Sequence, residues 1–149
     1  MTRTRILLRW LHLWLGLLLG VPFAVLALTG SALVFYIELD RALNPEISVP
    51  GAEPAPGWSS PVWDRALATA RSTWPDANGR WSFEATGEPG AIPARFYPAG
   101  SDHHQADPLM VWFSPDGSEL LREAQWGDYL MTFLYDIHRN FLAGEIGNE

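Results

Sequence analysis

The apolar and charged positions divide this chain into one continuous apolar segment and a longer mixed segment. Residues Trp10–Ile37 are 28 consecutive positions without a formal charge. A helix needs about 20 apolar residues to cross the hydrocarbon core of a bilayer. The pattern therefore predicts a short segment 1–9 and a membrane-spanning helix over residues 10–40, whose charged end emerges from the membrane.

A cleaved signal peptide is the alternative interpretation of this apolar segment. Gly30, Ser31 and Ala32 would provide a small-x-small cleavage site. The apolar core of a signal peptide, however, is only about 7–15 residues long. The apolar segment here continues through Ile37, which favours a retained helix.

The mixed segment begins with a proline-rich stretch and then shows a helical period followed by a strand period. Residues 41–61 are predicted to be a linker, and residues 62–128 to be an exported domain. Helical spacing runs from Val62 to Trp74, and apolar residues then alternate in RWSFE, AIPARFY and PLMVWF. The turn signal SPDG precedes one more segment. This predicts one helix with three or four antiparallel strands around a core of Trp63, Trp81, Phe83, Phe96, Val111 and Phe113.

The last segment returns to a helical period. Residues 129–149 place apolar side chains on one helix face, and we expect this helix to lead into a second membrane span. The expected apolar face consists of Leu130, Phe133, Leu134, Ile137 and Phe141. We therefore expect a membrane α-helical protein with an exported α+β domain, of which this chain is the N-terminal part.

The distribution of charge predicts the orientation. Arg3, Arg5 and Arg9 precede the span, whereas residues 38–128 contain 14 acidic residues and 6 arginines. Basic residues flank the cytoplasmic end of a span. We expect a cytoplasmic N-terminus in a bacterial inner membrane and a periplasmic middle domain. The acidic balance of that domain argues against a nucleic-acid partner.

One side of the predicted span carries almost no side chains. Residues at helical steps from His12 fall within an arc of about 120°, and they are Gly16, Gly20, Ala24, Ala27 and Ser31. Close helix packing through a small-x-x-x-small motif is one explanation. The other is a flat ligand on this side whose metal His12 binds, as imidazole does in haem proteins. The residues alone leave both explanations open.

Other candidate chemistry is sparse. The chain has no cysteine, which excludes disulfides, iron–sulfur clusters and covalent haem attachment, so any haem would be held non-covalently. His103 and His104, flanked by Asp102 and Asp107, suggest a metal site, but adjacent loop histidines are more often solvated. No nucleotide-binding or nucleophile-elbow motif occurs.

Four segments, in this order, resemble the PepSY-associated transmembrane family. They are LHLWLGLLLG (11–20), LTGSALVF (28–35), WDRALATARSTWPD (63–76) and YDIHRNFLAGEIG (135–147). The resemblance implies about four spans and an exported PepSY domain, and some similar proteins are haem-containing ferric-siderophore reductases. It favours His12 and His138 as ligands of haem iron, Gly16 and Gly20 beside the haem, and Arg139 beside a propionate. Without it, His138 would be an ordinary histidine at the membrane interface.

Two functions follow from this resemblance. The first is electron transfer on haem b, from a cytoplasmic donor to an exported acceptor such as a ferric siderophore, with the remaining transmembrane helices or another membrane subunit completing the haem sites. Because the chain crosses the bilayer between His12 and His138, we expect these residues to serve different haems. The second is a non-redox membrane anchor for a PepSY domain that binds peptides or inhibits a peptidase.

Overall fold

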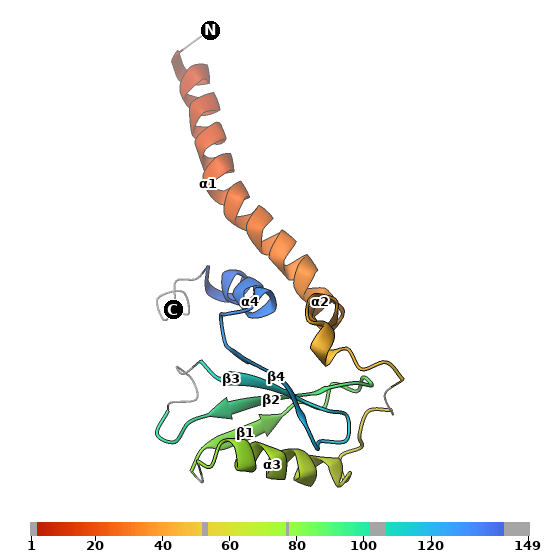
Figure 1. The fold of residues 1–149 in the computed structure, drawn as a ribbon. Helices are drawn as coiled ribbons and strands as arrows, with labels where there is room; N and C mark the ends of the chain where they lie inside the picture. The colour runs from red at the N-terminus through yellow and green to blue at the C-terminus, as the bar shows by residue number, and fades with distance from the viewer. Residues whose placement is uncertain (1–2, 52–53, 77, 102–106, 142–149) are drawn as a thin grey trace. The chain divides into compact units, whose positions relative to one another are not determined.

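The chain folds into two compact units. The computed structural model describes residues 3–51, 54–76, 78–101 and 107–141. The first unit contains α1 (Arg3–Val34) and the later part of α4 (Leu130–Asn140), and the second spans Ile37–Phe133. The remaining elements (Figure 1) are α2 (Tyr36–Leu43), η1 (Pro45–Ile47), α3 (Val62–Thr73), β1 (Arg80–Phe83), β2 (Ile92–Tyr97), β3 (Leu109–Phe113) and β4 (Leu120–Gln125).

Helix α1 is long and apolar enough to cross a membrane. Its 32 residues extend about 48 Å at 1.5 Å per residue. Its leucine and tryptophan side chains are largely exposed, as suits contact with lipid. Two hydroxyls in its second half are satisfied within the helix: Thr29 donates to Val25 O (2.8 Å) and Ser31 to Ala27 O (2.7 Å). Such internal bonding is required where no water is present.

The helix ends earlier than the sequence predicts. It stops at Val34, not at residue 40, because the Phe35 N–H bonds to Ala32 O (3.1 Å) and tightens the last turn. Helix α2 then begins at once. From Ile37 onward the chain belongs to the second unit, where the carboxyl of Asp40 is buried.

The second unit is built on a four-stranded antiparallel sheet in the order β1-β2-β3-β4. Register pairs Trp81 with Phe96 and Ala94 with Val111. The strand-period segments lie in β1, β2 and β3, and the segment after the SPDG turn forms β4. The predicted fold class, a membrane helix with one helix and three or four antiparallel strands, is confirmed.

Helix α3 packs on one face of the sheet and forms the core with it. Val111 and Phe113 of β3 are fully buried there against the small side chains of Ala66 and Ala70. Small residues on α3 let the helix approach the sheet closely, which leaves room for large rings on the strands. All six predicted core residues belong to this core or pack against it.

The SPDG turn fixes β4 onto the first turns of α3. Gly117 adopts φ +77°, and a Cβ there would lie 2.7 Å from Val62 O, so only glycine fits. Thr69 donates to Gly117 O (2.8 Å). The carboxylate of Asp116 accepts hydrogen bonds from Ser114 and Ser118, which lower the pKa of Asp116 to about 2.

The opposite face of the sheet is covered by α2, η1 and the residues leading into α4. Arg122 of β4 lies over the rings of Trp112 (4.6 Å) and Tyr129 (4.9 Å). Its guanidinium also contacts Asp40 (3.6 Å) and Glu46 (3.3 Å). Burial raises the pKa of the Asp40 carboxyl, although Arg122 acts in the opposite direction. Part of the predicted linker, residues 41–47, is therefore folded onto the domain.

Helix α4 ends at Asn140, and Phe141 follows in the left-handed region at φ 52°. A non-glycine residue is uncommon in this region. Of the helix predicted over residues 129–149, the structure shows Leu130–Asn140. The expected entry into a second span, over residues 142–149, lies outside the described residues.

Candidate functional site

The imidazole of His138 lies against the second half of α1, within the first unit. Its Nδ1 atom is 3.2 Å from Thr29 Oγ1 and 3.2 Å from Leu26 O. Thr29 is 7% exposed, the only buried residue of α1. His138 itself stays exposed. One ring nitrogen is thus held against the membrane-spanning helix while much of the ring remains accessible.

Gly30 provides the space for this contact. A Cβ built at Gly30 would lie 2.8 Å from Cε1 of His138 and 3.3 Å from Nδ1. Real side chains do not approach so closely, so any larger residue would push the ring away from α1. The hydroxyl of Thr29 and the absent side chain of Gly30 together form the surface that receives the ring. We call Leu26, Thr29 and Gly30 the histidine seat.

The first half of α1 presents the same kind of small residues but leaves them open. His12 is exposed on this helix. No described atom comes within 4 Å of a Cβ built at Gly16 or Gly20. These glycines therefore present bare backbone on which a flat group or another helix fits.

The two histidines occupy different levels of α1. Gly30 follows His12 by 18 residues, which is about 27 Å and five full turns of an α-helix. His138 contacts α1 at Gly30, so the two imidazoles lie far apart and on nearly the same side of the helix. Two ligands of one haem iron lie only about 4 Å apart, since each bond is near 2 Å. One iron cannot therefore bind both histidines in this structure.

The remaining predicted residues stand as follows. Arg139 is exposed beside His138 near the end of α4. His103 and His104 lie outside the described residues. Among the residues that the structure describes, no group of three or more His, Asp or Glu side chains could hold a metal ion.

Sequence patterns drew attention to His138 but not to its seat. Thr29 and Gly30 lie in the segment LTGSALVF, in which Thr29 is the first hydroxyl side chain of the apolar segment. A polar side chain within a membrane span is often functional, so Thr29 was a usable signal. Leu26 contributes only its carbonyl oxygen, for which the sequence holds no signal.

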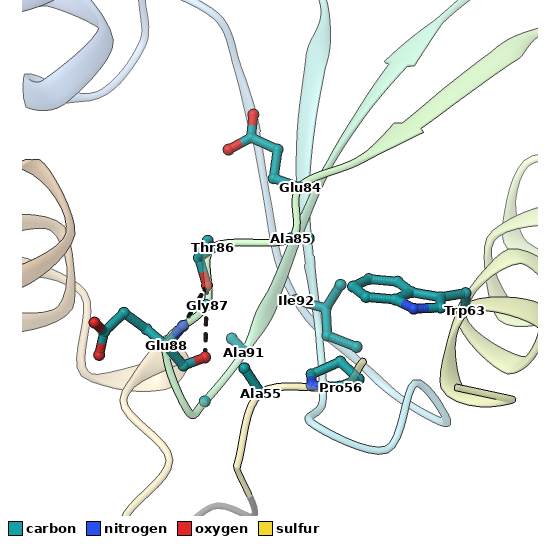
Figure 2. Close-up of a pocket in the computed structure, with 11 residues that line it drawn as sticks. Ala55, Pro56, Trp63, Glu84, Ala85, Thr86, Gly87, Glu88, Ala91 and Ile92 are labelled. Carbon is teal, nitrogen blue, oxygen red and sulfur yellow. Dashed lines mark hydrogen bonds between the residues drawn. The ribbon is translucent and has the colours of Figure 1, made fainter. Parts of the chain in front are cut away.

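Several depressions are lined by described residues of the sheet domain. The one drawn in Figure 2, bounded by Pro56, Trp63, Glu84 and Ile92 among others, has a cavity volume of about 10 Å³. That volume holds no more than about one water molecule. A second depression of about 210 Å³ lies between Trp58, Trp63, Phe83 and Ala85. A third, of about 310 Å³, is lined by Pro54, Pro56, Ser60, Val62, Arg65, Pro115 and Asp116.

Trp58 stands out beside the second depression because its side chain is 89% exposed. Trp58 also lines this depression, together with Trp63, Phe83 and Ala85. Its neighbour Trp63 is fixed by a hydrogen bond from Nε1 to Gly57 O (2.9 Å). The ring of Trp63 is therefore held in place, whereas the ring of Trp58 is exposed to solvent.

Comparison with known proteins identifies the family. No curated protein matches the chain. The family model of the PepSY-associated TM region matches residues 9–149, which include α1, the sheet domain and α4. The chain is a membrane protein with a PepSY-type domain, and it belongs to the PepSY-associated transmembrane family.

Proposed function

We propose that this protein transfers electrons across the membrane on non-covalently bound haem b. The observation that carries the proposal is the pair of accessible imidazoles, His12 and His138, on one membrane-spanning unit at levels about 27 Å apart. Two separate ligand positions along one side of a helix are what a transmembrane relay requires. A protein whose only task is to anchor a domain has no need of them.

The residues present fit a haem at each level. Near His12, the bare backbone at Gly16 and Gly20 leaves room for a flat macrocycle beside the imidazole. Near His138, the exposed residue contacts α1 through Nδ1, and Arg139 follows it as a partner for a propionate. Each iron would take its second ligand from a helix beyond the described residues or from another subunit.

Haem, when bound, accepts and releases one electron at a time, and the protein supplies position and surroundings. The apolar side chains of α1 exclude water between the two levels. The sheet domain then lies on the side of the membrane where the electron is delivered. The acceptor would be an exported compound such as a ferric siderophore, and the donor would be cytoplasmic.

The orientation rests on charge. Arg3, Arg5 and Arg9 precede the span, and basic residues mark the cytoplasmic end. We infer a bacterial inner membrane, a cytoplasmic N-terminus and a periplasmic sheet domain. His12 then serves the cytoplasmic side and His138 the periplasmic side.

A visible absorption spectrum of the purified complete protein tests the proposal. A reduced-minus-oxidised difference with b-type bands is the expected result. A folded protein that is colourless, even after haem is supplied during expression, contradicts it. Folding is checked separately by the near-ultraviolet circular dichroism of the tryptophans in the sheet domain.

A second function is favoured by Trp58. Its exposed ring beside a depression lined by Trp63 and Phe83 suits an apolar side chain of a bound peptide. In this case the protein is a membrane-anchored PepSY domain that binds peptides or inhibits a peptidase. Peptide binding that is lost in Trp58→Ala, in a protein without haem, would support this function over the first.

A further inference from the structure

We propose that Thr29 and Gly30 are positioning residues that fix the tautomer of His138, with the proton on Nδ1 and the lone pair on Nε2. The proposal concerns the protein before any cofactor binds. Its consequence for haem binding rests on the function proposed above.

Two oxygen atoms face Nδ1 of His138. Leu26 O, at 3.2 Å, is a carbonyl oxygen and can only accept a hydrogen bond. Thr29 Oγ1, also at 3.2 Å, has one proton, and its own nearest acceptor is Val25 O at 2.8 Å. With that proton engaged, the hydroxyl too presents a lone pair to the ring.

Nδ1 therefore faces two acceptors and must be the donor. The other neutral tautomer would set the lone pair of Nδ1 against the lone pairs of the Leu26 carbonyl oxygen, and the hydrogen bond would be lost. With the proton on Nδ1, the lone pair of the neutral ring lies on Nε2. This is the nitrogen that a metal would bind, and the hydrogen bond at the other nitrogen decides which one is available.

Gly30 is required because the ring must approach α1 closely for this bond to form. The 2.8 Å approach of Cε1 to the position of a Cβ leaves no room for even a methyl group. Gly30→Ala would move the ring off the helix and away from both acceptors. Gly16→Ala is the matched control, since no described atom lies within 4 Å of its Cβ position.

The test is the ¹⁵N spectrum of the histidine rings in the full chain, labelled on histidine and reconstituted in lipid nanodiscs without haem. His138→Gln identifies the signals of His138 among the four histidines. We expect the neutral ring of His138 to carry its proton on Nδ1 in the wild type and in Gly16→Ala. In Gly30→Ala this preference should be lost.

Thr29 is tested with two variants of similar size. Thr29→Val removes the hydroxyl and should weaken the preference for Nδ1–H, whereas Thr29→Ser keeps the hydroxyl and should restore it. A wild-type ring protonated on Nε2, or a tautomer that is the same in Gly30→Ala, Thr29→Val and wild type, overturns the proposal. If Gly30→Ala does not fold, the pair of Thr29 variants still decides.

Haem titration of the complete protein then separates this proposal from the proposed function. Loss of a group that orients a ligand typically weakens metal affinity about 10–100-fold, and we expect such a loss at one of two sites in Thr29→Val, with recovery in Thr29→Ser. If Thr29→Val and Thr29→Ser bind haem equally well, Thr29 does not position His138 for haem, but the electron-transfer function still stands. No haem in any variant, with Nδ1–H present in the wild type, overturns that function and leaves the tautomer assignment standing.

Discussion

Helix α1 presents small residues in both of its halves, and the halves differ in what covers them. In the first half, Gly16 and Gly20 meet no described atom within 4 Å. In the second half, Gly30 is covered by the imidazole of His138 at close contact. The same residue type thus marks open surface in one half and an occupied contact in the other, a difference that only the structure reveals.

The comparison shows what each half still requires. The second half receives a histidine from this chain, because His138 of α4 contacts Leu26 and Thr29. The first half has its own histidine, His12, but its bare side must be covered by something other than the described residues. Lipid, another helix and a flat cofactor are the three candidates.

The largest expected effect concerns which side of the membrane each half faces. A reporter fused after Gly100, in the sheet domain, should be active only as an export reporter, because Arg3, Arg5 and Arg9 hold the N-terminus inside. The result is all or none. Activity of a cytoplasmic reporter at this position would mean that the first half of α1 faces the outside of the membrane. Delivery of electrons to an exported acceptor by the sheet domain would then have no basis.

Substitution of the two histidines tests whether the halves hold separate haems. In the complete protein, His12→Ala and His138→Ala should each remove roughly half of the haem, since about 27 Å of helix separates the two positions. The haem content per protein, measured after extraction, is the readout. Loss of all haem in either variant, or of none, would contradict two independent sites.

A narrower test addresses the open half. Gly16→Leu should fill the bare side and remove haem at the level of His12 while leaving haem at the level of His138. If another helix packs on Gly16 and Gly20 instead, the same substitution would disturb the packing of that helix against α1. Haem content and size-exclusion profile of one preparation distinguish these outcomes.

Substitutions in the core of the sheet domain should have the smallest effect on the difference between the two halves of α1. They therefore serve as a control. Phe113 is fully buried, and Phe113→Ala should lower the free energy of unfolding by about 3–5 kcal/mol. Phe83 is only partly buried, so Phe83→Ala should cost less. Chemical denaturation monitored by tryptophan fluorescence measures both.

Those two substitutions should leave the tautomer of His138 unchanged, because Nδ1 of its ring is held by atoms of α1. A change in that tautomer on Phe113→Ala, under conditions where the domain is still folded, would mean that the seat depends on the second unit. The contrast between the halves of α1 would then not be a property of the helix alone.

Local patterns predicted the elements of the fold well. The alternation in RWSFE, AIPARFY and PLMVWF corresponds to β1, β2 and β3 because each strand shows one face to α3. The apolar segment that begins at Trp10 corresponds to α1, because its composition suits only a bilayer or a protein core. The period of apolar residues shows which face of a segment is buried, and each of these strands buries one face.

Contacts between distant segments were not predictable in this way. Asp40 was expected to emerge with the charged end of the span, yet it is 3% exposed beside Arg122. His138 and Thr29 are 109 residues apart, and no spacing rule relates them. Leu26 acts through its backbone oxygen, which every residue possesses. Such pairings depend on how elements pack, about which the pattern within each element says nothing.

The position of Arg122 also bears on how the sheet domain is joined to the rest of the chain. Its guanidinium contacts Asp40 near the beginning of the second unit and the ring of Tyr129 near its end. The entry and exit of the domain therefore lie within the reach of one side chain. A domain whose two ends lie close together can be inserted between two other segments of a chain. Such a domain can be replaced by a short linker, or by another domain with similarly close ends.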